Sequence, residues 1–77
     1  MKLTGVIQLE EDRYVAHCPE LGVVSQGDSQ EEACANLEEA CRLFLEYACE
    51  EEINGRLRAA QVVEFEVGGG EEADGET

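Results

Sequence analysis

Apolar and polar positions alternate with a period of two over residues 3–10 and again over residues 13–18. Such alternation is typical of strands, and the short polar break at residues 11–12 predicts an antiparallel hairpin. Pro19 has no N–H to give to a ladder, so it ends the second strand. After a turn, residues 23–26 make a third short strand.

The period then changes to three and four residues, which indicates a helix with one apolar stripe. Ser29 is expected to cap this helix, and Glu32, three residues later, completes a capping box. The stripe consists of Ala33, Leu37, Ala40, Cys41, Phe44 and Ala48. We expect the helix to end near Ile53, with Asn54-Gly55 as a left-handed stop.

Beyond the helix, residues 56–59 read as a connection and residues 61–67 alternate again, which predicts a fourth strand. Residues 68–77 are rich in glycine and acids and hold no apolar residue able to form a core, so we expect a disordered tail. The predicted fold class is α+β. One helix packs on one face of a small antiparallel sheet, in the order β-β-β-α-β, within a single domain of residues 1–67.

A sheet with one helix is covered on one face only. A chain of 77 residues also buries only about 60% of its unfolded surface, which makes a partner surface a natural supplement. Apolar residues expected on the other sheet face, and beside the helix stripe, therefore predict a homo-oligomer, dimer or tetramer. The expected interface residues are Val6, Val15, His17 and Val62 on the sheet and Leu43 and Tyr47 on the helix.

Charge narrows the choice of partner. Nineteen acids against five bases give a net charge of −14 and an isoelectric point near 4.1. The closely spaced phosphate charges of nucleic acid repel such a surface, so we expect no direct nucleic-acid binding. A basic protein suits it better, and the alternative that acidity only keeps the protein soluble stays open. No apolar run is long enough to span a membrane and the first residues show no signal-peptide pattern, so we expect a cytoplasmic protein.

The four cysteines, Cys18, Cys34, Cys41 and Cys49, include no Cys-x-x-Cys pair, and the last three follow helical intervals. We interpret them as thiols that act as small buried hydrophobes. Cys41 should lie in the core between helix and sheet. Cys49 should lie nearer the helix edge, within reach of solvent.

Candidates for enzyme chemistry are weak. The acids of residues 10–12 lie in a hairpin turn, where solvated carboxylates are the simpler interpretation than a Mg²⁺ site. Ser29 lacks a Gly-x-Ser-x-Gly elbow, and spacing places no nucleophile beside His17, the only histidine. We therefore expect no enzyme, with no catalytic, metal or cofactor-binding residues and no cofactor.

One stretch has a recognisable pattern. Residues 14–21 read Tyr-Val-Ala-His-Cys-Pro-Glu-Leu, and residues 22–29 read Gly-Val-Val-Ser-Gln-Gly-Asp-Ser. Glu-Ala, Asn-Leu and Glu-Ala follow at 32–33, 36–37 and 39–40. This pattern resembles the HicB-like antitoxin family. The resemblance implies a partial RNase H-like fold without that fold's metal-binding carboxylates.

The resemblance also implies a function. HicB-like proteins neutralise HicA, a small basic toxin that cleaves mRNA, and they commonly carry a C-terminal DNA-binding segment. Here only the glycine-rich acidic tail follows Val67, so the resemblance does not extend to DNA binding. The alternative is an orphan oligomeric domain of the same fold, structural or regulatory, with no toxin.

Two groups of residues are candidates for contact with a toxin. The first is the region of Tyr14, Pro19 and Glu20, and the second is the set of helix carboxylates Glu38, Glu39 and Glu46. For the first group an alternative stays open, in which Tyr14 packs in the core and Pro19 only ends a strand. For any single glutamate the alternative is an ordinary solvated helix face.

Overall fold

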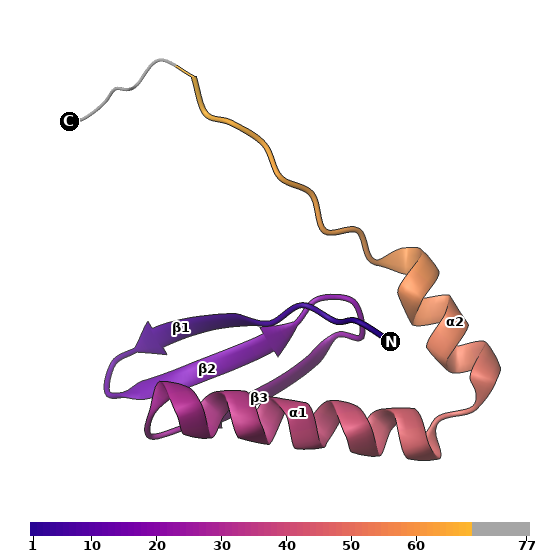
Figure 1. The fold of residues 1–77 in the computed structure, drawn as a ribbon, viewed down its shortest axis with the longest axis horizontal. Coiled ribbons are helices and arrows are strands. Elements are labelled where there is room, and N and C mark those ends of the chain that lie inside the picture. Colours follow the sequence, from indigo (N-terminus) through magenta and orange to yellow (C-terminus); the bar gives the residue numbers. More distant parts are fainter. Residues whose placement is uncertain (69–77) are drawn as a thin grey trace.

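The computed structural model describes residues 1–68, so the predicted acidic tail lies, from residue 69 on, outside the described residues. The fold is α+β, with a three-stranded antiparallel sheet in the order β1-β2-β3 followed by two helices (Figure 1). The elements are β1 (Val6–Glu10), β2 (Arg13–Cys18), β3 (Val23–Gly27), α1 (Gln30–Tyr47) and α2 (Glu50–Ala59).

The hairpin of β1 and β2 was predicted and is confirmed, but β1 starts at Val6 and not at Leu3. The register pairs Val6 with His17, so continuing the ladder would set Thr4 opposite Pro19. Because Pro19 has no N–H, the ladder ends before that point. The Thr4 N–H instead donates to Glu20 Oε1 at 3.1 Å.

The N-terminus of α1 is capped as the sequence predicts. Ser29 Oγ accepts a hydrogen bond from the Glu32 N–H at 3.0 Å, and Glu32 Oε1 accepts one from the Asp28 N–H at 2.7 Å. The reciprocal bond of the capping box thus reaches the residue before the cap and not the cap itself. Together the two bonds satisfy two backbone donors at this helix end.

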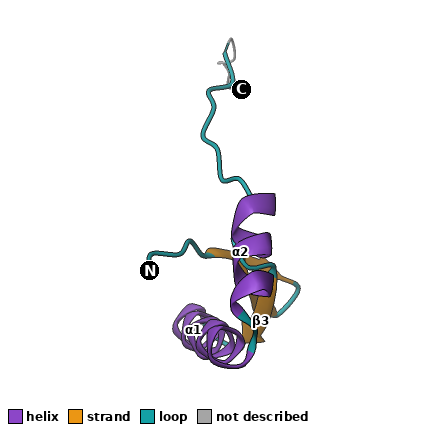
Figure 2. Ribbon diagram, turned by 90° about the vertical axis from the view of Figure 1, so that its right-hand side faces the viewer, coloured by secondary structure: helices purple, strands orange, loops and turns teal. Residues whose placement is uncertain are grey.

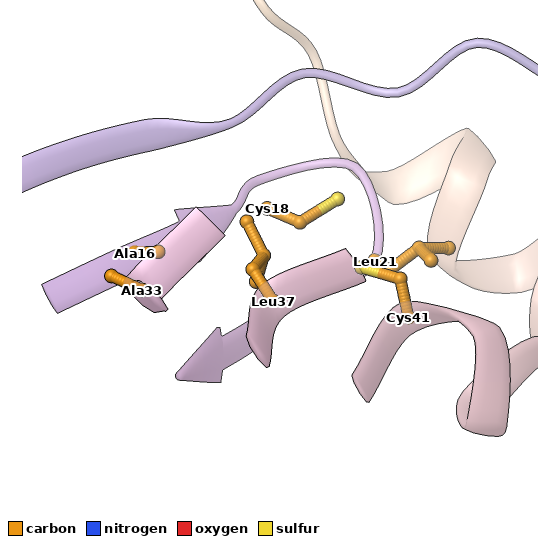
Figure 3. Packing of buried hydrophobic residues seen from close by; sticks show 6 residues of the cluster. All are labelled: Ala16, Cys18, Leu21, Ala33, Leu37 and Cys41. Carbon is orange, nitrogen blue, oxygen red and sulfur yellow. The ribbon is translucent and has the colours of Figure 1, made fainter. Parts of the chain in front are cut away.

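The core lies between α1 and the sheet and is built from small and medium side chains (Figure 3). Its buried members come from β2, the turn after it and the apolar stripe of α1: Ala16, Cys18, Leu21, Ala33, Leu37 and Cys41. Gly27 allows the closest approach, since a Cβ there would lie 2.6 Å from the Ala33 backbone nitrogen. The helix packs chiefly on β3 and β2, and only lightly on β1.

The prediction of one helix ending near Ile53 was wrong. The chain leaves the helical conformation at Ala48 and Cys49, whose ψ angles are 148° and 161°, and a second helix follows. Three glutamates at residues 50–52 would be unfavourable at the negative end of a longer helix. At the start of a new helix they complement its positive end instead. Asn54-Gly55 is therefore inside α2 and is not a stop.

The order β-β-β-α-β was also wrong, because residues 61–67 form no strand in the described structure. Residues 56–59, expected as a connection, belong to α2. This helix stands off one end of α1 and leads the chain away from the sheet (Figures 1 and 2). The alternating segment after it therefore has no sheet edge beside it, and Val62 is not on the sheet.

Two of the four cysteines are buried and two are exposed. Cys18 and Cys41 are buried, as predicted for Cys41, and Cys49 is exposed, also as predicted. The general interpretation as buried hydrophobes was wrong for Cys34, which is exposed. Cys34 follows Ala33, the buried stripe residue, so it points away from the core on the next position of the helix.

No helix within residues 1–68 is long and apolar enough to cross a bilayer.

Candidate functional site

The turn after β2 has a constrained backbone. Gly22 has a φ of 69°, a conformation that favours glycine, and its N–H donates to the Cys18 carbonyl at 2.8 Å. Leu21 is fully buried. An open groove of about 510 Å³ separates this turn from α2, with Pro19 and Glu20 on one wall and Gly55 and Arg56 on the other.

Glu20, on one wall of this groove, is held as an anion. Hydrogen bonds lower its pKa from 4.5 to about 2. The hydrogen bond from the Thr4 side chain contributes most, and burial, the second-largest effect, opposes it. The backbone N–H groups of Glu20 and Thr4 and the Cys18 thiol lower the pKa further. The sequence prediction named Glu20 as a candidate contact, and its environment keeps it charged.

Arg56 anchors α2 to the rest of the fold. Its Nη1 donates to the Leu21 carbonyl at 2.6 Å, and its guanidinium lies 4.7 Å from the centroid of the Phe44 ring. Its Nη2 also lies 3.5 Å from Glu52 Oε2. Sequence reasoning missed Arg56 because it assigned the residue to a connection. The available signal was charge order, with acids first and bases last over residues 50–59.

Carboxylates gather at the opposite end of the molecule. The β1–β2 turn and the start of α1 lie at the same end (Figure 1), and Arg13 Nη2 joins them through Asp28 Oδ1 at 3.4 Å. A shallow depression of about 350 Å³ beside the turn is lined by Glu10, Glu11 and Asp12. We call this region the acidic end; its carboxylates are Glu10, Glu11, Asp12, Asp28, Glu31 and Glu32.

The predicted contact residues do not form one cluster. Glu38, Glu39 and Glu46 are exposed along α1, and Arg42 pairs with Glu39 at 2.7 Å and with Glu38 at 3.8 Å. Pro19 and Glu20 lie beyond the far end of β2 from Tyr14. Tyr14 packs partly buried against the core.

The uncovered face of the sheet carries a row of three residues across the strands: Val6 on β1, His17 on β2 and Val24 on β3. Val15 shares this face on β2, as predicted. Val24 is 61% exposed and was not foreseen as part of it, although the alternation of residues 23–26 already placed it there.

Leu43 and Tyr47, the other predicted interface residues, are exposed on α1. The helix covers the opposite side of the sheet, so these two side chains do not join the row of Val6, His17 and Val24. The structure thus divides the predicted interface into two separate apolar surfaces.

No group of three or more His, Cys, Asp or Glu in the described part of the chain is arranged to hold a metal ion. His17 is exposed on the uncovered face, paired across the strands with two valines. The arrangement offers exposed carboxylates, an apolar sheet face and an open groove.

These features define a small α+β protein with an acidic surface and an incomplete sheet cover. Over 46 residues the chain is 48% identical to a UPF0150 protein of Helicobacter pylori strain J99. The aligned stretch covers 58% of this chain and 64% of that protein, so the chain spans somewhat less than two thirds of its relative's length. No family model matches the sequence, and no solved structure matches it.

Proposed function

We propose that this chain is a HicB-like antitoxin, a protein that binds a small basic HicA-type toxin and prevents it from cleaving mRNA. The observation that carries the proposal is the excess of carboxylates over bases in the described part of the chain. Fifteen acids and five bases lie within residues 1–68, a net of ten negative charges. Such a surface competes well with phosphates for a basic RNA-binding face.

Two further observations support the proposal. The first is the motif over residues 14–40, which resembles that of HicB-like antitoxins. Its turn follows β2, its helix cap lies in the loop after β3, and its helix positions lie on α1. The second is the similarity over 46 residues to a UPF0150 protein of Helicobacter pylori, which is compatible with a HicB-like chain.

The acidic end is the surface we propose for the toxin. Its carboxylates come from two segments that the fold brings together, the hairpin turn and the entry into α1 from Asp28 to Glu32. Arg13 pairs with Asp28 there. Glu38, Glu39 and Glu46 extend the negative surface along α1. Unpaired carboxylates that gain basic partners on binding steer association and favour the correct partner.

The test is an RNA-cleavage assay with a small basic HicA-type protein, sought first among the products of the genes that neighbour the one for this chain. Equimolar full-length protein should abolish cleavage of a model mRNA. The variant Glu10→Gln/Glu11→Gln/Asp12→Asn should need at least tenfold more protein for the same inhibition. A matched variant that removes three carboxylates elsewhere, Glu51→Gln/Glu64→Gln/Glu66→Gln, should inhibit nearly as well as the unchanged chain.

Cleavage that continues at full strength with a large excess of folded protein would contradict the proposal and favour an oligomeric domain without a toxin. Equal loss of inhibition in both triple variants would retain the antitoxin but reject the acidic end as its contact surface.

A further inference from the structure

Residues 61–67 have the alternating pattern of a strand, but within the described residues they pair with no other strand. Apolar Val63, Phe65 and Val67 alternate with Glu64 and Glu66. The three apolar side chains are 69, 80 and 81% exposed. Three large apolar side chains on one face of an extended segment are costly to leave in water, and together they mark an association surface.

β1 offers the edge that such a segment needs. Within residues 1–68 it pairs with β2 alone, so the backbone groups along its other side have no strand partner there and can accept another strand. Because α1 packs only lightly on β1, Leu9 on the helix side of this strand is 61% exposed. A mostly apolar groove of about 220 Å³ lies next to this edge, between α1 and the segment that precedes β1, with Leu3 and Leu37 on its walls.

The other edge, β3, is less suitable. It faces the helix layer with Val23, Ser25 and Gly27, and α1 already covers these positions. A strand added there would lie outside the helix and bury little apolar surface. The β1 edge therefore combines free backbone groups with uncovered apolar side chains, and the β3 edge does not.

The segment does not reach the β1 edge of its own chain. Arg56 holds α2 against Leu21 and Phe44, and Leu57 packs against the core. The helix then ends with the Ala60 N–H bonded to the Arg56 carbonyl, and the chain continues away from the sheet (Figures 1 and 2). A second copy can approach the projecting segment without disturbing these contacts.

We propose that residues 61–67 of one copy add as a strand to the β1 edge of a second copy, and that the exchange is reciprocal. The pairing is then self-complementary, as a two-fold dimer requires. Phe65 and its apolar neighbours lie on the helix side beside Ile7 and Leu9, and Glu64 and Glu66 lie on the other face. A slip of one residue would bury the glutamates, so the apolar pattern fixes the register. The proposal is independent of any toxin.

Sedimentation of the full-length chain gives the first test. The unchanged protein should sediment with twice the mass of the 8.4 kDa monomer. Phe65→Asp should raise the dimer dissociation constant by more than about tenfold, because an apolar ring leaves the interface. The matched control, Val24→Asp on the uncovered sheet face, should leave the dimer mass unchanged. Circular dichroism of both variants should show the helix content of the unchanged chain.

Isotope-filtered NMR on a mixture of ¹³C-labelled and unlabelled copies identifies the contact itself. Cross-peaks between the Phe65 ring of one copy and the Leu9 methyl groups of the other are expected. A monomer at all concentrations would overturn the proposal, and so would Phe65–Leu9 cross-peaks confined to single chains. A dimer that Val24→Asp breaks and Phe65→Asp leaves intact would overturn it in favour of the uncovered sheet face.

Discussion

Small residues decide how closely α1 approaches the sheet. Ala16 and Ala33 are fully buried, and Gly27 lets the start of the helix come within contact distance of β3. The sequence predicts these positions as strand, turn and stripe. Their role as the closest contact could not be read from it, because alternation indicates which face a residue occupies and not how near the next layer lies.

Replacing Gly27 with Ala tests this contact. A Cβ at residue 27 would lie 2.6 Å from the Ala33 nitrogen and 2.9 Å from the Glu32 carbonyl carbon, both of them backbone atoms. We expect a loss of about 1–3 kcal/mol in the free energy of unfolding, typical of overpacking in a core. Urea denaturation measures it, with Gly68→Ala as the control because its Cβ meets nothing within 4 Å. An unchanged midpoint for Gly27→Ala would contradict the close approach.

Ionisation of Glu20 should make the free energy of unfolding depend on pH in the acid range. Its folded pKa of about 2 lies below the ordinary value of 4.5, so its hydrogen bonds stabilise the fold fully above pH 4.5. This contribution decreases as the pH falls from 4.5 and is lost through pH 2. The side-chain carboxyl carbon of Glu20 should titrate in NMR with a midpoint near 2. Glu20→Gln should flatten the pH dependence of the unfolding midpoint in this window. An NMR titration midpoint of Glu20 near pH 4.5 would reject the hydrogen-bond assignment.

At the scale of elements, the sequence predicts the hairpin, the third strand and the capped start of α1, because local patterns specify each of them. It fails where two local signals compete. The apolar stripe continues through Ala48, while the charges of residues 50–52 favour a new helix start, and the charges prevail. Residues 61–67 fail for another reason, since a strand requires an edge that no local pattern supplies.

Gly55 distinguishes the two interpretations of the second helix. Inside a helix, glycine is less favourable than alanine, and a Cβ at residue 55 meets nothing within 4 Å. Gly55→Ala should therefore raise the helix content and stabilise α2 by about 0.5–1 kcal/mol. Thermal circular dichroism measures both effects. A loss of stability would indicate the left-handed stop that the sequence first suggested.

The candidate site was predictable only in part. Glu20 and the helix carboxylates could be named from a motif and from charge. The acidic end could not, because its carboxylates are separated in sequence and meet only when the hairpin turn folds beside the start of α1. The role of Arg56 could not be predicted for a similar reason, since its hydrogen-bond acceptor, the Leu21 carbonyl, lies 35 residues away in the sequence.

At the scale of the whole molecule, the negative net charge should weaken association between two copies and strengthen association with a basic partner. Two copies of a chain with ten net negative charges over residues 1–68 repel each other. Added salt screens this repulsion, so the dimer dissociation constant should fall as ionic strength rises from about 0.01 to 0.3 M. Sedimentation equilibrium over this range measures it. Dimerisation that weakens with salt would show that attraction between charges, and not apolar strand addition, holds the copies together.

The association rate with a small basic HicA-type protein, measured against ionic strength by stopped-flow fluorescence, tests the central claim most directly. An acidic surface that steers a basic toxin should give a rate that falls steeply over the same salt range, while the dissociation rate changes little. The carboxylate-to-amide variant of residues 10–12 should show a shallower fall. An association rate that stays constant across the range, or a partner that does not bind at all, would contradict the account.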